Sequence, residues 1–267
     1  MRDYVIMSGT GNRFFVVDDR NGLVADPAAM TKDICGRLGL DGGLFVRKSS
    51  RADFRMAIIN ADGSEAEMCG NGSRCVARFA FDRGVVRSRT MNFETQAGII
   101  AAEVLEDGSV RVRLTDPKDG RLNFSLKTPS FDGKVSFLNT GVPHTVILSE
   151  DVDAMDVVRL GREIRYSEPF KPAGTNVNFM SVLDGSTIRV RTYERGVENE
   201  TMACGTGSTA SAIVSWMLGR TKPPVTVITR GGERLAVHFE PGKGSKDAVT
   251  NVRLEGPVRY EEEKDAT

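Results

Sequence analysis

The stretch EMCGNGSRC (67–75) places a cysteine directly before a Gly-x-Gly sequence, and a helical pattern follows. The same arrangement returns far downstream as TMACGTGST (201–209), with Cys204 in the position of Cys69. Glycine permits close approach of the backbone to other groups. A single cysteine before glycine is more often a small packed hydrophobe than a catalyst. The second occurrence favours a shared chemical role for the two cysteines.

Each motif predicts a buried helix immediately after it. SRCVARFAFDR (73–83) carries apolar residues at helical spacing, and Gly84 is its expected end. STASAIVSWML (208–218) is small or apolar on nearly every side, which is typical of a helix enclosed by other elements. Cys75 lies on the apolar face of the first helix. We interpret it as a core residue, together with Cys35 in another predicted helix.

The segments around the two motifs follow one another in the same order. A predicted strand precedes each motif, at 54–60 and at 187–193. A hairpin with a glycine-containing turn follows each predicted helix, at 101–114 and at 225–239. An acidic residue lies four positions before each cysteine, Glu65 and Glu200. This repeat of more than a hundred residues predicts two similar domains built from both strands and helices.

Composition excludes several classes of protein. The 36 Lys and Arg residues balance 36 Asp and Glu residues, which argues against a basic nucleic-acid surface. No apolar run approaches the roughly 20 residues that span a bilayer, and the first residues lack a secretory pattern. We therefore expect a cytoplasmic protein with reduced cysteines. The four cysteines and two histidines do not have metal-site spacing, so no metal is expected.

Two thiols that share one setting suggest proton transfer rather than nucleophilic attack. A helix N-terminus lowers the pKa of a cysteine from about 8.5 and can also bind a carboxylate. If Cys69 and Cys204 faced each other across a carbon, one thiolate could remove its proton and the other thiol could return one. This inverts the stereocentre without a cofactor, provided that preorganised donors hold the neighbouring carboxylate. The Gly-x-Gly sequences complete no nucleotide-binding motif.

The chain resembles the diaminopimelate epimerase family in five segments, in the family's order. They are GTGNRFFVVDD (9–19), NADGSEAEMCGNGSRCVARF (60–79), NTGVPHTV (139–146), GTNVNF (174–179) and YERGVENETMACGTGSTAS (193–211). The resemblance implies pyridoxal-independent conversion of LL-diaminopimelate to meso-diaminopimelate, for lysine and peptidoglycan precursor synthesis, by a homodimer.

The resemblance also implies the architecture. The fold is expected to be α+β, with two pseudosymmetric domains that are each a strongly curved, mostly antiparallel sheet wrapped around a central helix. The N-terminal half is expected over 1–122, joined by the tail 255–267, and the C-terminal half over 123–254.

The family pattern implies roles for individual residues. Cys69 and Cys204 are the acid and base thiols, and His144 and Glu194 assist thiol deprotonation. Backbone N–H groups bind the α-carboxylate, from Gly70, Asn71, Gly205 and Thr206. Further side chains bind the substrate, namely Asn12, Asn60, Asn176, Glu194 and Arg195. In these roles Arg195 is a fork for the distal carboxylate, and Glu194 is a partner for an ammonium group.

Simpler interpretations stand beside these roles. Asn60 and Asn176 could support turns, Arg195 could be a surface charge, and His144 beside Pro143 could orient a loop.

Three positions depart from the family pattern. Val142 stands where asparagine is frequent, Arg13 where an acidic residue is frequent, and Gly42 where glutamine is frequent. None is one of the two cysteines, so the expected reaction is less affected than the fine substrate contacts. Other interpretations remain open: a proline or 4-hydroxyproline racemase, an isomerase of the phenazine-biosynthesis type, or a noncatalytic small-molecule-binding protein.

Overall fold

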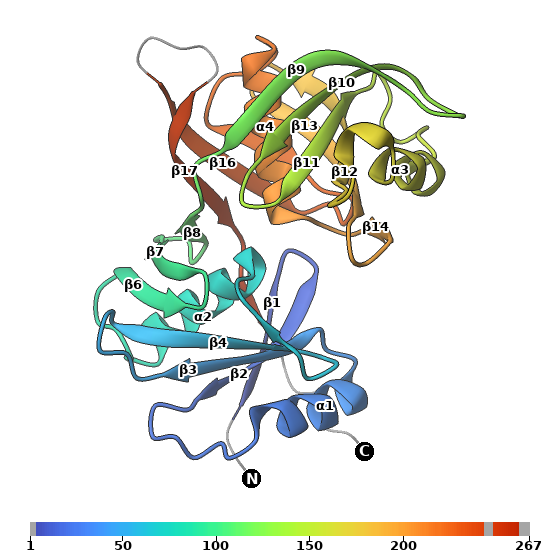
Figure 1. The fold of residues 1–267 in the computed structure, drawn as a ribbon. Helices are drawn as coiled ribbons and strands as arrows, with labels where there is room; N and C mark the ends of the chain where they lie inside the picture. Colours follow the sequence, from blue (N-terminus) through green and yellow to red (C-terminus); the bar gives the residue numbers. More distant parts are fainter. Residues whose placement is uncertain (1–3, 243–247, 262–267) are drawn as a thin grey trace. The chain divides into compact units, whose positions relative to one another are not determined.

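The computed structural model describes residues 4–242 and 248–261, and the chain forms two compact units (Figure 1). Unit 1 holds residues 4–113 and, after the chain returns, 255–261. Unit 2 holds 114–242 and 248–254. The parts of the expected domains at 1–3, 243–247 and 262–267 lie outside the described residues.

The chain enters unit 2 after Arg113, whereas the sequence placed the boundary after residue 122. The difference lies in β9 (Lys118–Lys127), which begins before the expected boundary. This strand pairs antiparallel with β10 (Asp132–Asn139), from Lys118 opposite Asn139 to Lys127 opposite Asp132. Backbone pairing therefore ties residues on both sides of position 122 to the second unit.

Unit 1 is a mixed sheet in which each strand pairs with the next one named. In spatial order its strands are β18 (Arg259–Glu261), β1 (Val5–Gly9), β2 (Asn12–Asp18), β3 (Gly42–Arg47), β4 (Phe54–Asn60), β6 (Thr90–Thr95), β7 (Gly98–Val104) and β8 (Val110–Arg113). Only β2–β3 and β4–β6 are parallel among these pairs. Helices α1 (Pro27–Leu38) and α2 (Gly70–Asp82) lie in the two parallel connections, and β5 (Glu65–Ala66) forms a short hairpin with β4.

Unit 2 repeats this topology. In spatial order its strands are β9, β10, β11 (Pro143–Leu148), β12 (Asn176–Asp184), β13 (Thr187–Glu194), β15 (Val225–Ile228) and β16 (Arg234–Pro241). The parallel pairs, β11–β12 and β13–β15, are the third and fifth in this order, as β2–β3 and β4–β6 are in unit 1. Their connections contain α3 (Val157–Arg165), the 3-10 helix η1 (Glu168–Phe170) and α4 (Gly205–Met217), and β14 (Asn199–Thr201) forms the hairpin with β13. Strand β17 (Val249–Gly256) leads back to unit 1.

The repeat confirms the predicted α+β fold class with two similar halves. The strand at β9 lies beside β10, as the C-terminal strand β18 lies beside β1. The tail thus supplies unit 1 with the outer strand that unit 2 has in its own sequence.

Helices α2 and α4 are the cores of their units. Each packs against six strands of its own unit, and α4 is buried along nearly its whole length, as its composition predicted. Both helices begin three residues earlier than predicted, at Gly70 and Gly205, because the glycines after each cysteine adopt helical geometry. Cys75 and Cys35 are buried in α2 and α1, which confirms their interpretation as core residues.

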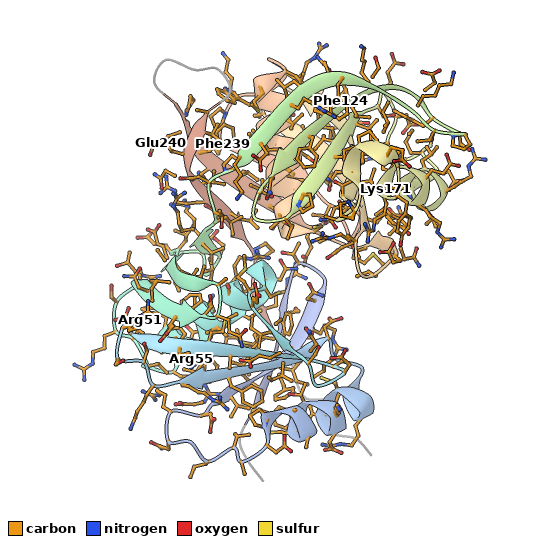
Figure 2. All side chains as sticks on the ribbon, viewed as in Figure 1. Arg51, Arg55, Phe124, Lys171, Phe239 and Glu240 are labelled. Atoms are coloured by element: carbon orange, nitrogen blue, oxygen red, sulfur yellow. The ribbon has the colours of Figure 1, made fainter. Side chains whose placement is uncertain are left out.

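A second apolar layer covers the outer side of each sheet. In unit 1 it lies under α1 and includes Phe15 and Phe45, whose rings meet edge to face with centroids 5.7 Å apart. In unit 2, Phe170 packs among the residues under α3, and Phe124 of β9, labelled in Figure 2, meets its ring at 6.4 Å between centroids. No helix in the described ranges is long and apolar enough to cross a membrane.

The contact between α3 and β13 makes a testable prediction. A Cβ atom at Gly161 would lie 2.4 Å from the Cβ of the fully buried Tyr193, so Gly161→Ala should lower the free energy of unfolding by about 1–3 kcal/mol. Gly36 of α1 is the matched control, since a Cβ there has no atom within 4 Å. Gly36→Ala should raise stability by up to about 1 kcal/mol through helix propensity. Urea unfolding of both variants measures this, and equal effects would contradict the packing argument.

Candidate active site

Cys69 is the N-cap residue of α2. Its backbone is extended, with φ −142° and ψ 116°, and its sulfur accepts a hydrogen bond from the Gly72 N–H at 3.4 Å. The first N–H groups of a helix have no partner within the helix, so they point toward whatever lies at its end. A sulfur in this position gains a hydrogen-bond donor and the positive end of the helix dipole, both of which favour a thiolate. Cys69 is partly exposed to solvent.

Asn71 and Asn12 lie together beside this helix start. The Asn71 side chain is buried and donates from Nδ2 to Oδ1 of Asn12 at 2.7 Å. The Asn71 Oδ1 in turn accepts a hydrogen bond at 2.8 Å from Arg74, one turn further along α2. Arg74 is fully buried, and the sequence analysis did not select it. The helical pattern of 73–83 gave no signal for it, since Arg74 falls with Arg78 on the side away from the apolar residues.

Cys204 occupies the same N-cap position on α4, with an equally extended backbone but a different environment. Its side chain is buried, and Thr206 Oγ1 lies 3.6 Å from its sulfur. Burial raises the pKa of Cys204 to about 12, and the negative charge of Glu194 adds to the rise. Cys204 therefore holds its proton near neutral pH. A Cβ at Gly207 would lie 2.3 Å from Oδ1 of Asn178 and 3.2 Å from the Cys204 sulfur, so only glycine fits here.

Glu194 and Arg195 follow each other at the end of β13. Burial raises the pKa of Glu194, and a hydrogen bond from Thr201 Oγ1 at 2.9 Å partly opposes that rise. The Arg195 guanidinium donates to the Ala173 carbonyl at 3.2 Å. Glu194 is thus a partly buried carboxylate next to a cysteine, and Arg195 is a partly exposed cation in the following turn.

Asn176 holds the Arg195 turn in place. Its Oδ1 accepts the Arg195 backbone N–H at 2.8 Å, and its Nδ2 donates to the Pro143 carbonyl at 3.1 Å. Both ends of the amide are occupied, which agrees with the supporting interpretation of this residue. Asn60 also makes a local contact: its exposed side chain donates to Ser64 Oγ within the β4–β5 turn.

His144 is completely buried on β11. Its pKa falls to about 3, because burial disfavours the charged ring and Arg195 adds repulsion, while Asn178 opposes both. The ring is therefore neutral at physiological pH. Nδ2 of Asn178 lies 3.2 Å from the His144 Nδ1 and can only donate, so the ring proton belongs on Nε2. Nε2 has no hydrogen-bond partner among the described residues.

Asn178 connects His144 with the start of α4, although the sequence analysis did not select it. It donates to the Thr145 carbonyl and to His144, and its Oδ1 accepts from Thr192. The same Oδ1 lies against Gly207. Its place within GTNVNF (174–179) was the available signal.

Strand register relates the positions of the two units. Ile59 pairs with Glu65 as Tyr193 pairs with Glu200, so Asn60 corresponds to Glu194. In unit 1, Gly42 pairs with Asn60 and with Phe14. In unit 2, Asn176 pairs with His144 and lies opposite Glu194, next to the Val177–Tyr193 pair. Gly42 therefore corresponds to Asn176, Phe14 to His144, and Asn12 to Val142. Two of the three departures from the family pattern therefore lie at positions that the repeat pairs with predicted site residues.

The third departure, Arg13, has a structural explanation. Its guanidinium forms an ion pair with Glu261 of β18 at 2.8 Å, and its backbone N–H donates to Asp41. Arg13 thus links the C-terminal strand to β2. Gly42 is also constrained, since a Cβ there would lie 2.5 Å from the Ile59 carbonyl oxygen.

The predicted residues thus gather at two helix starts. Beside α2 the structure joins Asn12, Asn71 and Cys69, and Asn60 lies in a turn with only a local contact. In unit 2 the charge of Glu194 acts on Cys204, and Asn176 accepts a hydrogen bond from the Arg195 backbone. No group of three or more His, Cys, Asp or Glu residues within the described ranges could hold a metal ion.

Comparison with known proteins identifies the family. The family model described as diaminopimelate epimerase matches residues 4–118 and 136–252. This chain belongs to the diaminopimelate epimerase family. It is 46% identical over 251 residues to the diaminopimelate epimerase of Aquifex aeolicus, covering 87% of this chain and 88% of that protein. It is 40% identical to that of a Hydrogenobaculum species, covering 95% and 97%.

Solved structures with the same fold are more distant in sequence. A phenazine biosynthesis protein of the PhzF family from Bacillus anthracis superposes with a TM-score of 0.74 at 16% identity, covering 96% of each chain. A probable proline racemase from Agrobacterium radiobacter gives a TM-score of 0.68 at 16% identity, covering 96% of this chain and 90% of that one. These likenesses show the fold, which this family shares with proteins of other names.

The buried histidine predicts how stability depends on pH. Since the folded pKa of His144 is about 3 and the ordinary value is 6.5, the unfolded chain takes up this proton first as the pH falls. The free energy of unfolding should therefore be highest above pH 6.5 and decrease toward pH 3, with His144 contributing at most about 1.4 kcal/mol per pH unit.

Urea unfolding between pH 7 and pH 4 tests the contribution of His144. His144→Asn should unfold more easily at pH 7 and show a flatter decrease in stability on acidification. His238→Asn removes the other histidine of the chain and serves as the control. An unchanged slope in His144→Asn would show that this ring is not kept neutral by the fold.

Proposed function

We propose that this protein interconverts LL- and meso-diaminopimelate without a cofactor, with Cys69 and Cys204 as its acid and base thiols. The observation that carries this proposal is the repetition of one arrangement in both units, a cysteine at the N-cap of the central helix. Nothing in the packing of a helix requires cysteine at its N-cap, where serine, threonine, aspartate and asparagine are preferred. The names of the relatives supply the substrate.

The reaction consists of two proton transfers at one carbon. A thiolate removes the α-proton, and the thiol of the other cysteine delivers a proton to the opposite face. Electrons from the broken C–H bond pass into the α-carboxylate and return to carbon when the new bond forms. The two thiols thereby exchange protonation states. Proton exchange with solvent after product release restores them, and so does a turnover in the reverse direction.

The backbone of both helix starts is suited to hold the α-carboxylate. The N–H groups that follow each cysteine, which have no partner within the helix, belong to Gly70 and Asn71, and to Gly205 and Thr206. They are preorganised donors, so negative charge that develops on the carboxylate requires little rearrangement of the protein. A side chain at Gly70 would meet no atom within 4 Å, which is consistent with room beside this N-terminus.

Two side chains of unit 2, Glu194 and His144, assist the acid thiol Cys204. Glu194 keeps the proton on Cys204 through its charge, and its own raised pKa makes it a plausible acceptor of that proton when Cys204 must become the base. His144 contributes from its neutral form, because its pKa of about 3 excludes a resting imidazolium.

The remaining predicted residues bind the rest of the substrate. We assign Arg195 to the distal carboxylate, with Glu194 nearby for an ammonium group, and we assign Asn12 and Asn60 as amide contacts. Asn176 acts through the turn that it holds. We further propose that the protein is a cytoplasmic homodimer and serves lysine and peptidoglycan precursor synthesis.

Deuterium exchange tests the substrate and the two-thiol reaction together. Reduced protein in D₂O should incorporate deuterium at the α-carbon of LL-diaminopimelate as the meso isomer appears, read by mass spectrometry and chiral chromatography. L-Proline and trans-4-hydroxy-L-proline should not exchange. Exchange of an imino acid instead would replace the substrate, and no exchange with any of the three would replace the function.

Cysteine variants test the roles of the thiols. Cys69→Ala and Cys204→Ala should each reduce epimerisation by at least about 10³-fold, since neither face can then be served by the missing acid or base. Cys35→Ala removes a buried thiol in α1 and is the matched control, with activity expected near that of the parent. Substantial inversion by either of the first two variants would contradict the two-base reaction.

A further inference from the structure

Arg74 is the largest fully buried side chain in the described part of the chain, and it lies in the first turns of α2. Three hydrogen bonds from its guanidinium go to residues near Cys69 in the sequence or to Thr10. One guanidinium nitrogen donates to the Gly70 carbonyl at 3.4 Å, and the other donates to Oδ1 of Asn71 and to the hydroxyl of Thr10. A buried charge is costly, so its retention beside this cysteine calls for a functional explanation.

The first consequence of these contacts is the orientation of two amides. A guanidinium can only donate, so the atom of Asn71 that faces it must be the oxygen. The Asn71 amino group then faces Asn12, whose oxygen accepts it at 2.7 Å. The Asn12 amino group therefore points away from Asn71 and can donate a hydrogen bond to another acceptor. The buried guanidinium of Arg74 thus fixes the orientation of both amide groups.

The second consequence is a permanent positive charge at this turn. Guanidinium does not lose its proton in proteins, so the charge is present at every relevant pH. At neighbouring Cys75 burial raises the pKa to about 12, and the charge of Arg74 opposes this rise. Glu261 of β18, which acts in the same direction as burial, is itself paired with Arg13 at 2.8 Å.

The equivalent turn of unit 2 has the opposite character. Counting from each cysteine, the position of Arg74 is taken by Thr209, whose hydroxyl donates to the Gly205 carbonyl at 2.9 Å. The hydrogen bond back into the turn is retained and the charge is lost. In addition, the position of the neutral Asn60 is taken by Glu194, which faces Cys204.

We propose that Arg74 is a positioning residue that makes Cys69 the anionic member of the pair in the resting enzyme, and that it orients Asn71 and Asn12 for substrate. This inference rests on the proposed function, but the alkylation experiment that tests it needs no substrate. With Cys69 as the resting base and Cys204 as the resting acid, the free protein is prepared for the diastereomer whose α-proton faces Cys69.

Alkylation of Cys69 measures the charge effect without any substrate. In a Cys204→Ala background, iodoacetamide reacts with the thiolate of Cys69, and peptide mapping by mass spectrometry gives its rate at pH 7. Arg74→Met should slow this reaction about tenfold, and Arg74→Lys should keep it within about threefold of the parent. Circular dichroism and thermal unfolding establish that each variant is folded.

Arg78 is the matched control on the same helix. It is partly buried, with an ion pair to Asp82 and a hydrogen bond to the Gly108 carbonyl, and neither partner belongs to the turn that begins at Cys69. Arg78→Met should leave the alkylation rate within about twofold of the parent. Equal slowing in the Met variants of Arg74 and Arg78, or no slowing in folded Arg74→Met, would overturn the proposal.

Steady-state kinetics test the orienting role, with both cysteines present. Lysine supplies the charge but not the planar fork, so Arg74→Lys should raise KM for diaminopimelate at least about fivefold while Cys69 alkylation stays near normal. This variant also decides the matter if Arg74→Met does not fold. An unchanged KM in Arg74→Lys would overturn the orienting role. Loss of deuterium exchange in the parent, with the alkylation effect intact, would instead refute the proposed function alone.

Discussion

The structure depends on one local arrangement used twice, a cysteine at the N-cap position of a buried helix. Helices α2 and α4 are each surrounded by strands of their own unit, so their N-termini are the places where unpaired N–H groups reach the surface of the core. Placing a thiol at each of these ends gives it donors and a favourable dipole. The glycines that follow let the chain turn closely around the sulfur, and at Gly207 no larger side chain fits. Fold and chemistry therefore share the same short segment.

The two units repeat in topology but not in electrostatics. Near Cys69 there is a buried cation and a neutral amide, Arg74 and Asn71, whereas near Cys204 there is a neutral threonine and a carboxylate, Thr209 and Glu194. Even the repeated glutamates differ: Glu65 is exposed, while Glu200 forms a bidentate pair with the buried Arg191. A reaction that removes a proton from one side and adds one on the other needs an acid and a base at the same time. A perfectly symmetric pair would have no preferred starting state.

The sequence predicted much of the fold because the repeat combined several independent signals. The strand at 54–60 has the predicted bounds and that at 187–193 extends by one residue, since alternating or continuous apolar residues between turns leave little choice. The helix starts were predicted three residues too late. A Gly-x-Gly sequence is typical of a loop, but here it follows an N-cap residue and forms the first turn of the helix. Among the site residues, Arg74 and Asn178 were missed. Their importance comes from partners distant in sequence, such as Thr10 for Arg74 and His144 for Asn178.

The sequence by itself determined the chemistry that is available: two equivalent cysteines before helices, no metal-ligand spacing, and a motif set that identifies the family. These properties are local, so neighbouring residues suffice to express them. Only the tertiary structure decided which groups are buried and what faces them. Burial raised the pKa of Cys204, kept His144 neutral, and enclosed Arg74 with the amides that it orients. Desolvation and charge pairing depend on contacts across the sheet and between strand and helix. These contacts join residues that are far apart in the sequence, so the sequence alone does not give their distances.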